Sequence, residues 1–91
     1  MAVIVRVPTI LRTYTGGEAE VSVEGANLRE VLSNLEAKFT GIGPRILDDN
    51  GKIRRFVNVY VNEEDVRFEN GLDTSTADGS IVSVLAAVAG G

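Results

Sequence analysis

Hydrophobic and polar residues alternate along four stretches of the chain, at residues 2–7, 18–24, 54–61 and 80–85. Successive side chains of a β-strand point to opposite faces of a sheet, so this alternation predicts four strands with one buried face each. A shorter apolar stretch, Val66–Phe68, predicts a fifth strand at a sheet edge. The residues expected to face the core are Val3, Val5, Val7, Ala19, Val21, Val23, Val57, Val59, Val61, Val82 and Val84.

The first two predicted strands are separated by strong turn signals. Pro8 has no backbone N–H to donate to a sheet ladder, so it ends the first strand. Thr15-Gly16-Gly17 is typical of a turn. We therefore expect the strands at residues 2–7 and 18–24 to pair as a hairpin.

One amphipathic helix is predicted between residues 28 and 39, where apolar residues recur every three or four positions. Asn27 is a good N-cap, and Glu30 three positions later completes the spacing of a capping box. Gly41 follows the last apolar position and is a natural helix end. A short helical turn is expected near residues 45–47.

The order of these elements is β-β-α-β-(β)-β. It predicts an α+β fold of the β-grasp type, with a mixed sheet of four to five strands and one main helix packed on one face. We place the β-grasp domain at residues 1–87 and a flexible Gly-Gly tail at residues 88–91. Leu72, between two turn signals, is expected to tuck into the body of the domain.

Composition narrows the possible functions of this 91-residue chain. The sequence has no cysteine and no histidine, which removes thiolate nucleophiles, iron–sulfur ligands and the commonest general base. The net charge of −4 disfavours binding to nucleic acid, and no apolar run is long enough to span a membrane. The N-terminus lacks the pattern of a secretory signal, so we expect a cytoplasmic protein.

The C-terminal residues Val88, Ala89, Gly90 and Gly91 are small and uncharged. Glycine has no Cβ, so a terminal Gly-Gly can pass through a narrow slot and carry the main-chain carboxylate into a partner's active site. We predict that the Gly91 carboxylate is the working group and that Val88, Ala89 and Gly90 thread it to the partner. The alternative is an inert end that happens to contain two glycines.

A second candidate site is an apolar surface patch. Phe56 and Tyr60 share one side of a predicted strand, and Ile81 and Leu85 share one side of another. If those strands are neighbours, the four side chains form an exposed partner-binding surface on the sheet face away from the helix. The alternative is that loops cover them. The acidic run Glu63-Glu64-Asp65 is interpreted as a solvated turn, with docking to a basic partner as the next alternative.

Several segments carry a resemblance to known proteins: Pro8-Thr9-Ile10-Leu11-Arg12, Thr15-Gly16-Gly17, residues 55–68 and Ala87-Val88-Ala89-Gly90-Gly91. With the β-grasp order and the terminal Gly-Gly, the chain resembles the ubiquitin-like sulfur carriers of the ThiS and MoaD families. It is most similar to the actinobacterial sulfur carriers of cysteine biosynthesis. Residues 40–52 and the middle of the second strand depart from that pattern, which leaves partner choice open.

The resemblance implies a carrier acted on by partner enzymes, not an enzyme. An E1-like adenylyltransferase/sulfurtransferase would use ATP to adenylylate the Gly91 carboxylate, and sulfur would then replace AMP to give a thiocarboxylate. A pyridoxal-phosphate cysteine synthase would use this sulfur with O-phosphoserine and leave a cysteinyl adduct on Gly91. A JAMM-type zinc metallopeptidase would release the cysteine. The chain itself would bind no cofactor or metal, and the docking mode of the family points to Leu85 as a contact.

Three alternatives stay open at this point. The carrier could serve thiamine, molybdopterin or a thio-containing secondary metabolite. Gly91 could instead form an isopeptide bond to a lysine, which would make the chain a ubiquitin-like protein modifier. Finally, the chain could be a binding module whose C-terminal residues are inert.

Overall fold

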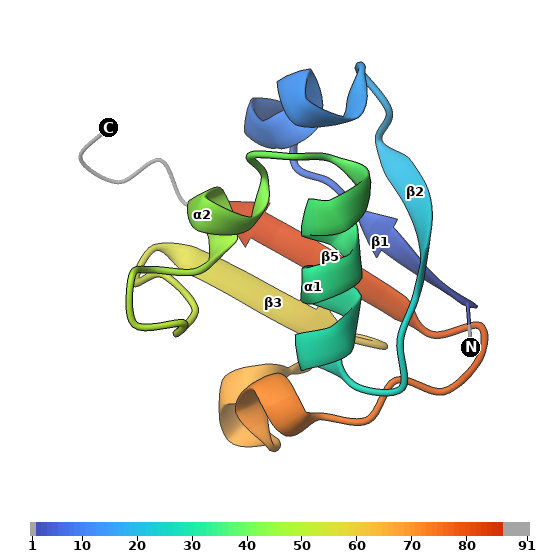
Figure 1. Ribbon diagram of the computed structural model, residues 1–91. Helices are drawn as coiled ribbons and strands as arrows, with labels where there is room; N and C mark the ends of the chain where they lie inside the picture. The colour runs from blue at the N-terminus through green and yellow to red at the C-terminus, as the bar shows by residue number, and fades with distance from the viewer. Residues whose placement is uncertain (1, 87–91) are drawn as a thin grey trace.

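The computed structural model describes residues 2–86 of the chain. A five-stranded sheet runs in the order β2-β1-β5-β3-β4, and the longest helix, α1, crosses one of its faces (Figure 1). The strands are β1 (Ala2–Arg6), β2 (Glu20–Glu24), β3 (Val57–Val61), β4 (Glu64–Asp65) and β5 (Ile81–Ala86). The α-helices are α1 (Leu28–Lys38) and the single-turn α2 (Gly43–Ile46).

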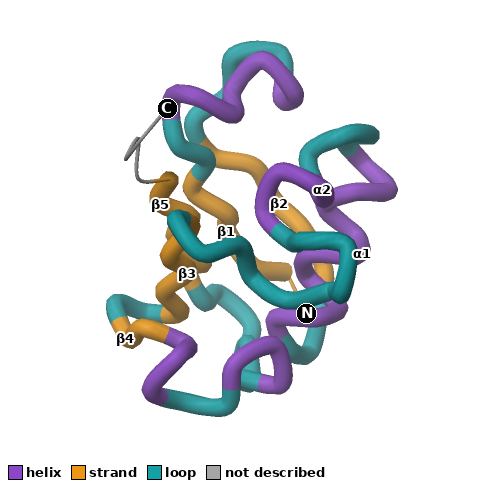
Figure 2. Tube along the Cα trace, turned by 90° about the vertical axis from the view of Figure 1, so that its left-hand side faces the viewer, coloured by secondary structure: helices purple, strands orange, loops and turns teal. Residues whose placement is uncertain are grey.

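The sheet is mixed, as predicted. β1 pairs antiparallel with β2 and parallel with β5, while β3 pairs antiparallel with both β5 and β4. The last strand therefore lies in the centre of the sheet, between β1 and β3. The molecule has two layers, with the sheet on one side and α1 and α2 on the other (Figure 2).

The core lies between these layers and contains the predicted alternating valines. Apart from Ala19, every strand residue expected to face the core is buried, with at most 6% of its surface exposed. The helix contributes Leu28, Val31, Leu32 and Leu35, which are at most 3% exposed. Leu72, in the 3₁₀ helix η3 (Gly71–Asp73), packs against this core as expected.

The start of α1 confirms the predicted cap. The Asn27 side chain accepts a hydrogen bond from the Glu30 N–H at 2.9 Å. The Glu30 carboxylate in turn accepts from the Ala26 N–H at 2.9 Å, one residue earlier than the usual partner in a capping box. One N-terminal donor of the helix, the Glu30 N–H, is thus satisfied by a local side chain, while the Leu28 N–H donates to the distant Thr74 carbonyl at 2.9 Å.

The end of α1 is tied to α2 by one carboxylate. Glu36 accepts hydrogen bonds from the Gly41 N–H, at 3.0 Å to the nearer oxygen, and from the Gly43 N–H at 2.6 Å. These bonds favour the ionised carboxylate and hold the pKa of Glu36 below its ordinary value of 4.5. Gly41 has a φ of +101°, a backbone conformation that suits glycine.

The connection between β1 and β2 differs from the prediction. The two strands do form a hairpin, but residues 9–15 form a 3₁₀ helix, η1 (Thr9–Thr15), in place of a simple turn. Its side chains Leu11 and Thr15 are buried, so the segment is anchored to the domain. The prediction that the second strand begins at residue 18 and buries Ala19 is wrong, because β2 begins at Glu20 and Ala19 is exposed.

Two predictions around β3 are also wrong. Val66–Phe68 is not an edge strand but the 3₁₀ helix η2, because the Asp65 side chain accepts from the Arg67 N–H at 2.9 Å and turns the chain. The edge strand is β4, immediately before it. The strand predicted at residues 54–61 begins only at Val57, whose N–H donates to the Arg54 carbonyl at 3.0 Å in a turn.

Candidate functional site

The candidate site begins where the central strand β5 ends. Ala86, the last described residue of this strand, lies opposite Val57 of β3. The tail residues of the prediction, Val88, Ala89, Gly90 and Gly91, lie outside the described residues, as does the boundary placed at residue 87. The structure therefore fixes the strand that leads toward the predicted working group.

A groove of about 700 Å³ lies beside this end of β5. The strand contributes Ser83, Val84, Leu85 and Ala86 to its lining. The end of β1, the start of η1 and the neighbouring strands β2 and β3 contribute the other residues. These are Arg6, Val7, Pro8, Thr9, Arg12, Ala19, Glu20, Tyr60 and Glu63.

Two residues of the predicted partner surface meet in this groove. Leu85 is 50% exposed and lies opposite Asn58, while Tyr60 lies opposite Ser83 on the same pair of strands. Both side chains are on the sheet face away from α1, as expected from the alternation of their strands. β3 and β5 are neighbours, which the prediction required.

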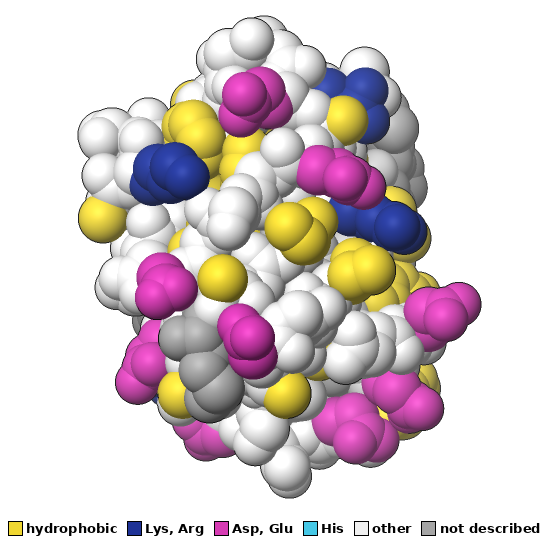
Figure 3. All heavy atoms as spheres, turned by 90° about the vertical axis from the view of Figure 1, so that its right-hand side faces the viewer, with side chains coloured by type: hydrophobic (Ala, Val, Ile, Leu, Met, Phe, Trp, Pro, Cys, Tyr) yellow, Lys and Arg dark blue, Asp and Glu magenta, His cyan; other side chains and the backbone are white. Residues whose placement is uncertain are grey.

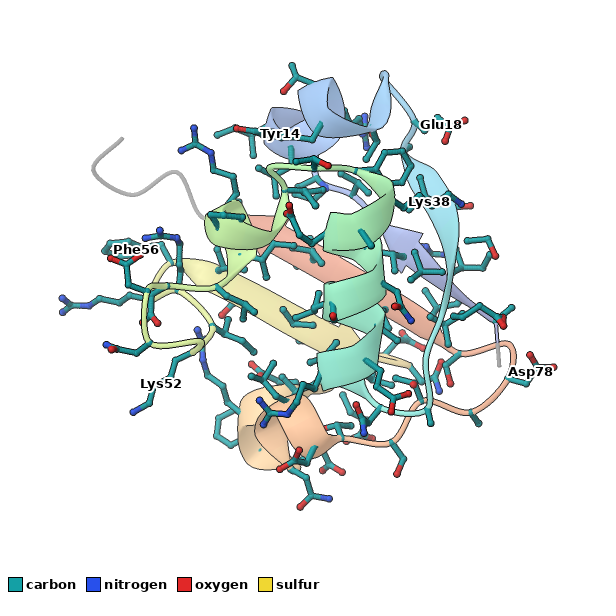
Figure 4. All side chains as sticks on the ribbon, viewed as in Figure 1. Tyr14, Glu18, Lys38, Lys52, Phe56 and Asp78 are labelled. Atoms are coloured by element: carbon teal, nitrogen blue, oxygen red, sulfur yellow. The ribbon has the colours of Figure 1, made fainter. Side chains whose placement is uncertain are left out.

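The other two predicted surface residues lie apart from the groove. Ile81 pairs with Ile4 of β1 at the other end of β5 and is half-buried. Phe56 is 50% exposed but belongs to the turn before β3, so strand alternation does not place it (Figure 4). The Arg55 guanidinium lies 5.8 Å from the centre of the Phe56 ring.

The groove also contains residues that the sequence interpretation did not select for a site. Arg12 is held in place by a hydrogen bond from its Nε to the Val7 carbonyl at 3.1 Å. Arg6 forms an exposed ion pair with Glu20 at 3.1 Å. The signal that could have found Arg12 is the Pro8–Arg12 segment, which entered only through the family resemblance and had no structural role assigned to it.

Arg67 of η2 braces the strand that supports the end of β5. Its guanidinium donates to the Val57 carbonyl at 2.6 Å, to the Arg54 carbonyl at 3.2 Å and to the Asn58 side chain. A second arginine, Arg45, donates a hydrogen bond to the Tyr14 hydroxyl at 2.7 Å and so joins α2 to η1. These contacts fix the elements around the strand end without using the groove.

Charge is unevenly distributed over the surface. On the side of the molecule turned toward the viewer in Figure 3, basic side chains lie in the upper part together with some acidic ones, while the lower part is acidic. Within the predicted acidic run, Asp65 is used as the cap of η2, while Glu63 and Glu64 are exposed. Among residues 2–86 no cluster of potential metal ligands is found, and no helix there is long and apolar enough to cross a membrane.

Comparison with known proteins covers the whole chain. The model of the ThiS family matches residues 5–91. The sulfur carrier protein CysO of Mycobacterium tuberculosis is 55% identical, and the alignment covers 100% of both chains. One chain in the crystal structure of the Amycolatopsis orientalis BexX/CysO complex is 48% identical and superposes with a TM-score of 0.91, covering 98% of this chain and 99% of that one.

A further relative comes from the archaea. Small archaeal modifier protein 3 of Haloferax volcanii is 38% identical over 68 residues, which is 75% of this chain and 73% of the relative. Together with the mixed five-stranded sheet, these similarities confirm the predicted β-grasp fold. The CysO relatives are carrier proteins and not enzymes, in agreement with the prediction that this chain is acted on by others.

Proposed function

The chain belongs to the ThiS family, and we propose that it is a sulfur carrier that holds sulfur as a thiocarboxylate on Gly91 and delivers it for cysteine biosynthesis. The observation that carries the proposal is the full-length identity of 55% to the sulfur carrier protein CysO. The family match extends to residue 91, so it includes the glycine that would carry the sulfur.

Activation of the carboxylate requires a partner. A carboxylate is a poor acyl donor, and adenylylation with ATP forms an acyl-adenylate and releases pyrophosphate. A sulfur nucleophile then attacks the Gly91 carbonyl, and AMP leaves. We propose an E1-like adenylyltransferase/sulfurtransferase for these steps. ATP as co-substrate is consistent with a cytoplasmic reaction.

The position of β5 suits this role. The strand that leads to Gly91 is central in the sheet and hydrogen-bonded on both sides, so its end is a well-supported base. Five residues follow Ala86, and an extended chain of that length spans at most about 18 Å. A carboxylate on such a segment can enter an active site that the folded domain cannot enter.

The last step of the proposed function is delivery of the sulfur. A pyridoxal-phosphate cysteine synthase would join the thiocarboxylate sulfur to the β-carbon of O-phosphoserine while phosphate leaves. The resulting thioester would transfer its acyl group from sulfur to the amine of the same cysteine, which gives a peptide-bonded C-terminal cysteine on Gly91 and frees the thiol. A JAMM-type zinc metallopeptidase would then hydrolyse this bond and regenerate the Gly91 carboxylate. ATP, pyridoxal phosphate and zinc thus belong to the partners. The absence of cysteine from the chain is useful here, because no side-chain thiol can compete for the activated carbonyl.

A reconstitution tests the proposal. The purified chain is incubated with ATP and the adenylyltransferase from the same organism, and pyrophosphate release is measured. We expect release that depends on the chain, and none with a variant that lacks Gly90 and Gly91. The thiocarboxylate form is then incubated with O-phosphoserine and the cysteine synthase. A C-terminal cysteine on the chain supports the cysteine pathway, and its absence contradicts it.

A second function is favoured by one specific observation. The relative from Haloferax volcanii is a small archaeal modifier protein, and activation of Gly91 would be the same for a modifier as for a carrier. The two functions differ only in the final nucleophile. A modifier leaves a branched peptide, its own C-terminal segment ending in Gly90-Gly91, on the lysines of target proteins after proteolysis, whereas a carrier does not.

A further inference from the structure

The parallel ladder between β1 and β5 stops before β5 ends. The ladder begins with the Ile4 N–H, which donates to the Ser80 carbonyl at 2.9 Å, and continues in register to the pair Arg6–Ser83. In a parallel ladder, the next bond would run from the N–H of residue 8 to the Val84 carbonyl. Residue 8 is proline and has no N–H to donate. The chain turns away here into η1.

The end of β5 therefore presents a short main-chain edge toward the groove. The Asn62 N–H donates to the Ile81 carbonyl at 2.8 Å, so the antiparallel bonds to β3 fall on Ile81 and every second residue after it. The main-chain groups of Val84 and Ala86 point the other way. By the registers of the two ladders, the Val84 carbonyl and the Ala86 N–H face away from β3 and beyond the last pair with β1, and no loop or turn of residues 2–86 supplies a main-chain partner for them.

The groove provides room for an additional strand along this edge. Its volume of about 700 Å³ lies between the end of β5 and the start of η1, the track that β1 would have continued to occupy. The Val84 carbonyl and the Ala86 N–H lie on the same edge of β5. They match the main chain of an extended peptide, which presents an N–H and a C=O at the same spacing. Tyr60 and Leu85 supply apolar surface for its side chains.

The charged residues that line the groove indicate which side chain a bound segment would place there. Arg6 and Glu20 neutralise each other in an ion pair, but the guanidinium of Arg12 has no acidic partner within the described residues. Its Nε is held by the Val7 carbonyl, which leaves its terminal nitrogens available to an acceptor on a partner. Glu63, on the other side of the groove, belongs to the β3–β4 turn. An acidic side chain is thus favoured at the η1 end.

We propose that this edge is a docking site for an extended segment of the activating adenylyltransferase, which adds a short strand to β5 and places an acidic side chain on Arg12. The inference rests on the proposed function, because it assigns that partner's contact at the base of the Gly91 segment. Strand addition at this point fixes the direction of β5 relative to the partner, and so directs the residues after Ala86 into its active site.

Ala86→Pro tests the main-chain bond. Ala86 lies opposite Val57 in a pair whose main-chain groups do not bond to β3, so the substitution removes the donor that faces the groove and no bond of the β3–β5 ladder. Ala86→Val keeps the N–H and is the matched control. We expect the KM for the carrier in adenylylation to rise about 3- to 10-fold with Ala86→Pro, as for one lost hydrogen bond, while kcat stays the same. An unchanged KM overturns the proposal.

Amide hydrogen exchange gives a second measurement that does not need a variant. The Ala86 amide is expected to exchange rapidly in the free chain and to become protected when the adenylyltransferase is added. Protection already present in the free monomer would show that another part of the chain fills the groove, and protection that depends on dimer formation would show a second copy there. Either result contradicts the proposal.

Substitutions of Arg12 test the proposed contact with an acidic side chain. Arg12→Gln retains a donor for the Val7 carbonyl and removes the charge, whereas Arg12→Glu reverses it. We expect a modest rise in KM with Arg12→Gln and a larger rise with Arg12→Glu. At high salt, the KM values of the variants and the wild type should differ less. Equal KM values for both variants and the wild type exclude the acidic contact. If the wild-type chain is not adenylylated at all, the proposed function fails; if it is adenylylated and all variants match it, only the docking site fails.

Discussion

Arg67 is predicted to stabilise the fold more than an exposed arginine normally does. Its guanidinium ties η2 to the turn before β3, through the main-chain carbonyls of Arg54 and Val57 and the side chain of Asn58. The bond to Val57 is partly buried, and the other two are exposed. Arg67→Ala leaves the Val57 carbonyl without this charged donor, although the bond from the Arg67 N–H to Asp65 remains.

The size of the effect follows from these contacts. A hydrogen bond that involves a charged group contributes about 1.5–3 kcal/mol when buried, and exposed bonds contribute much less. We therefore expect Arg67→Ala to lower the free energy of unfolding by about 1–2 kcal/mol. For a domain of this size, each kcal/mol corresponds to a decrease in Tm of roughly 4–8 °C. Arg67→Lys should recover part of the loss, because an ammonium can reach one carbonyl but not three acceptors.

Urea unfolding and thermal denaturation of matched variants measure the difference. Arg29→Ala is the control, because the side-chain contact of Arg29 is an exposed ion pair with Asp73 in which both side chains are at least 60% exposed. Its cost should stay within about 0.5 kcal/mol. Equal unfolding free energies for Arg67→Ala and Arg29→Ala would refute the reasoning, because the contacts of Arg67 would then count for no more than a surface ion pair.

Three further substitutions test other parts of the account. In Gly25→Ala, the new Cβ would lie 2.6 Å from Val31 Cγ2 and 2.7 Å from the Val31 main-chain nitrogen, so we expect a loss of at least about 2 kcal/mol in urea unfolding. Glu36 has a folded-state pKa below its ordinary value of 4.5, so its contribution to the free energy of unfolding is fully present above pH 4.5 and is lost as the pH falls through the folded-state pKa. Glu36→Gln should therefore flatten the decline of the unfolding free energy on acidification. An unchanged slope would contradict this. Gly91→Ala places a Cβ beside the reacting carbonyl, and we expect kcat/KM for adenylylation to fall at least about tenfold while Tm is unchanged; full activity would argue against a narrow entry slot.

The core and the main helix could be predicted because each rests on a local pattern. Val57, Val59 and Val61 alternate with polar neighbours, and the single buried face of β3 allows only one register. Asn27 and Glu30 form contacts with residues nearby in sequence, so their spacing alone predicts the cap. Such signals do not depend on how distant segments meet.

The errors around β3 occurred where a hydrogen-bonded turn interrupted a strand-like pattern. Val66–Phe68 has the composition of a strand but becomes a 3₁₀ helix because Asp65 caps it and Arg67 reaches back to the turn before β3. The same turn takes Phe56 out of β3, so strand alternation does not determine which way its side chain points. Local alternation could not reveal either contact.

The groove depends on pairing between the two ends of the chain. Pro8 was correctly interpreted as the end of the first strand. Its consequence for the Val84 carbonyl appears only when β1 and β5 are known to be parallel neighbours. The sequence could predict Leu85 as a surface residue, but not that Arg12 lies beside it in the same groove.

The most direct test of the central claim is the intact mass of the chain isolated from its own cells under non-reducing conditions. The sulfur-carrier function predicts a species in which one oxygen is replaced by sulfur, or one that carries an additional C-terminal cysteine, and tandem fragmentation should place either change on Gly91. The cysteine adduct would also identify the pathway. An unmodified mass, together with larger conjugates in which a target lysine carries the C-terminal peptide of this chain through Gly91 after proteolysis, would contradict the claim and identify a protein modifier.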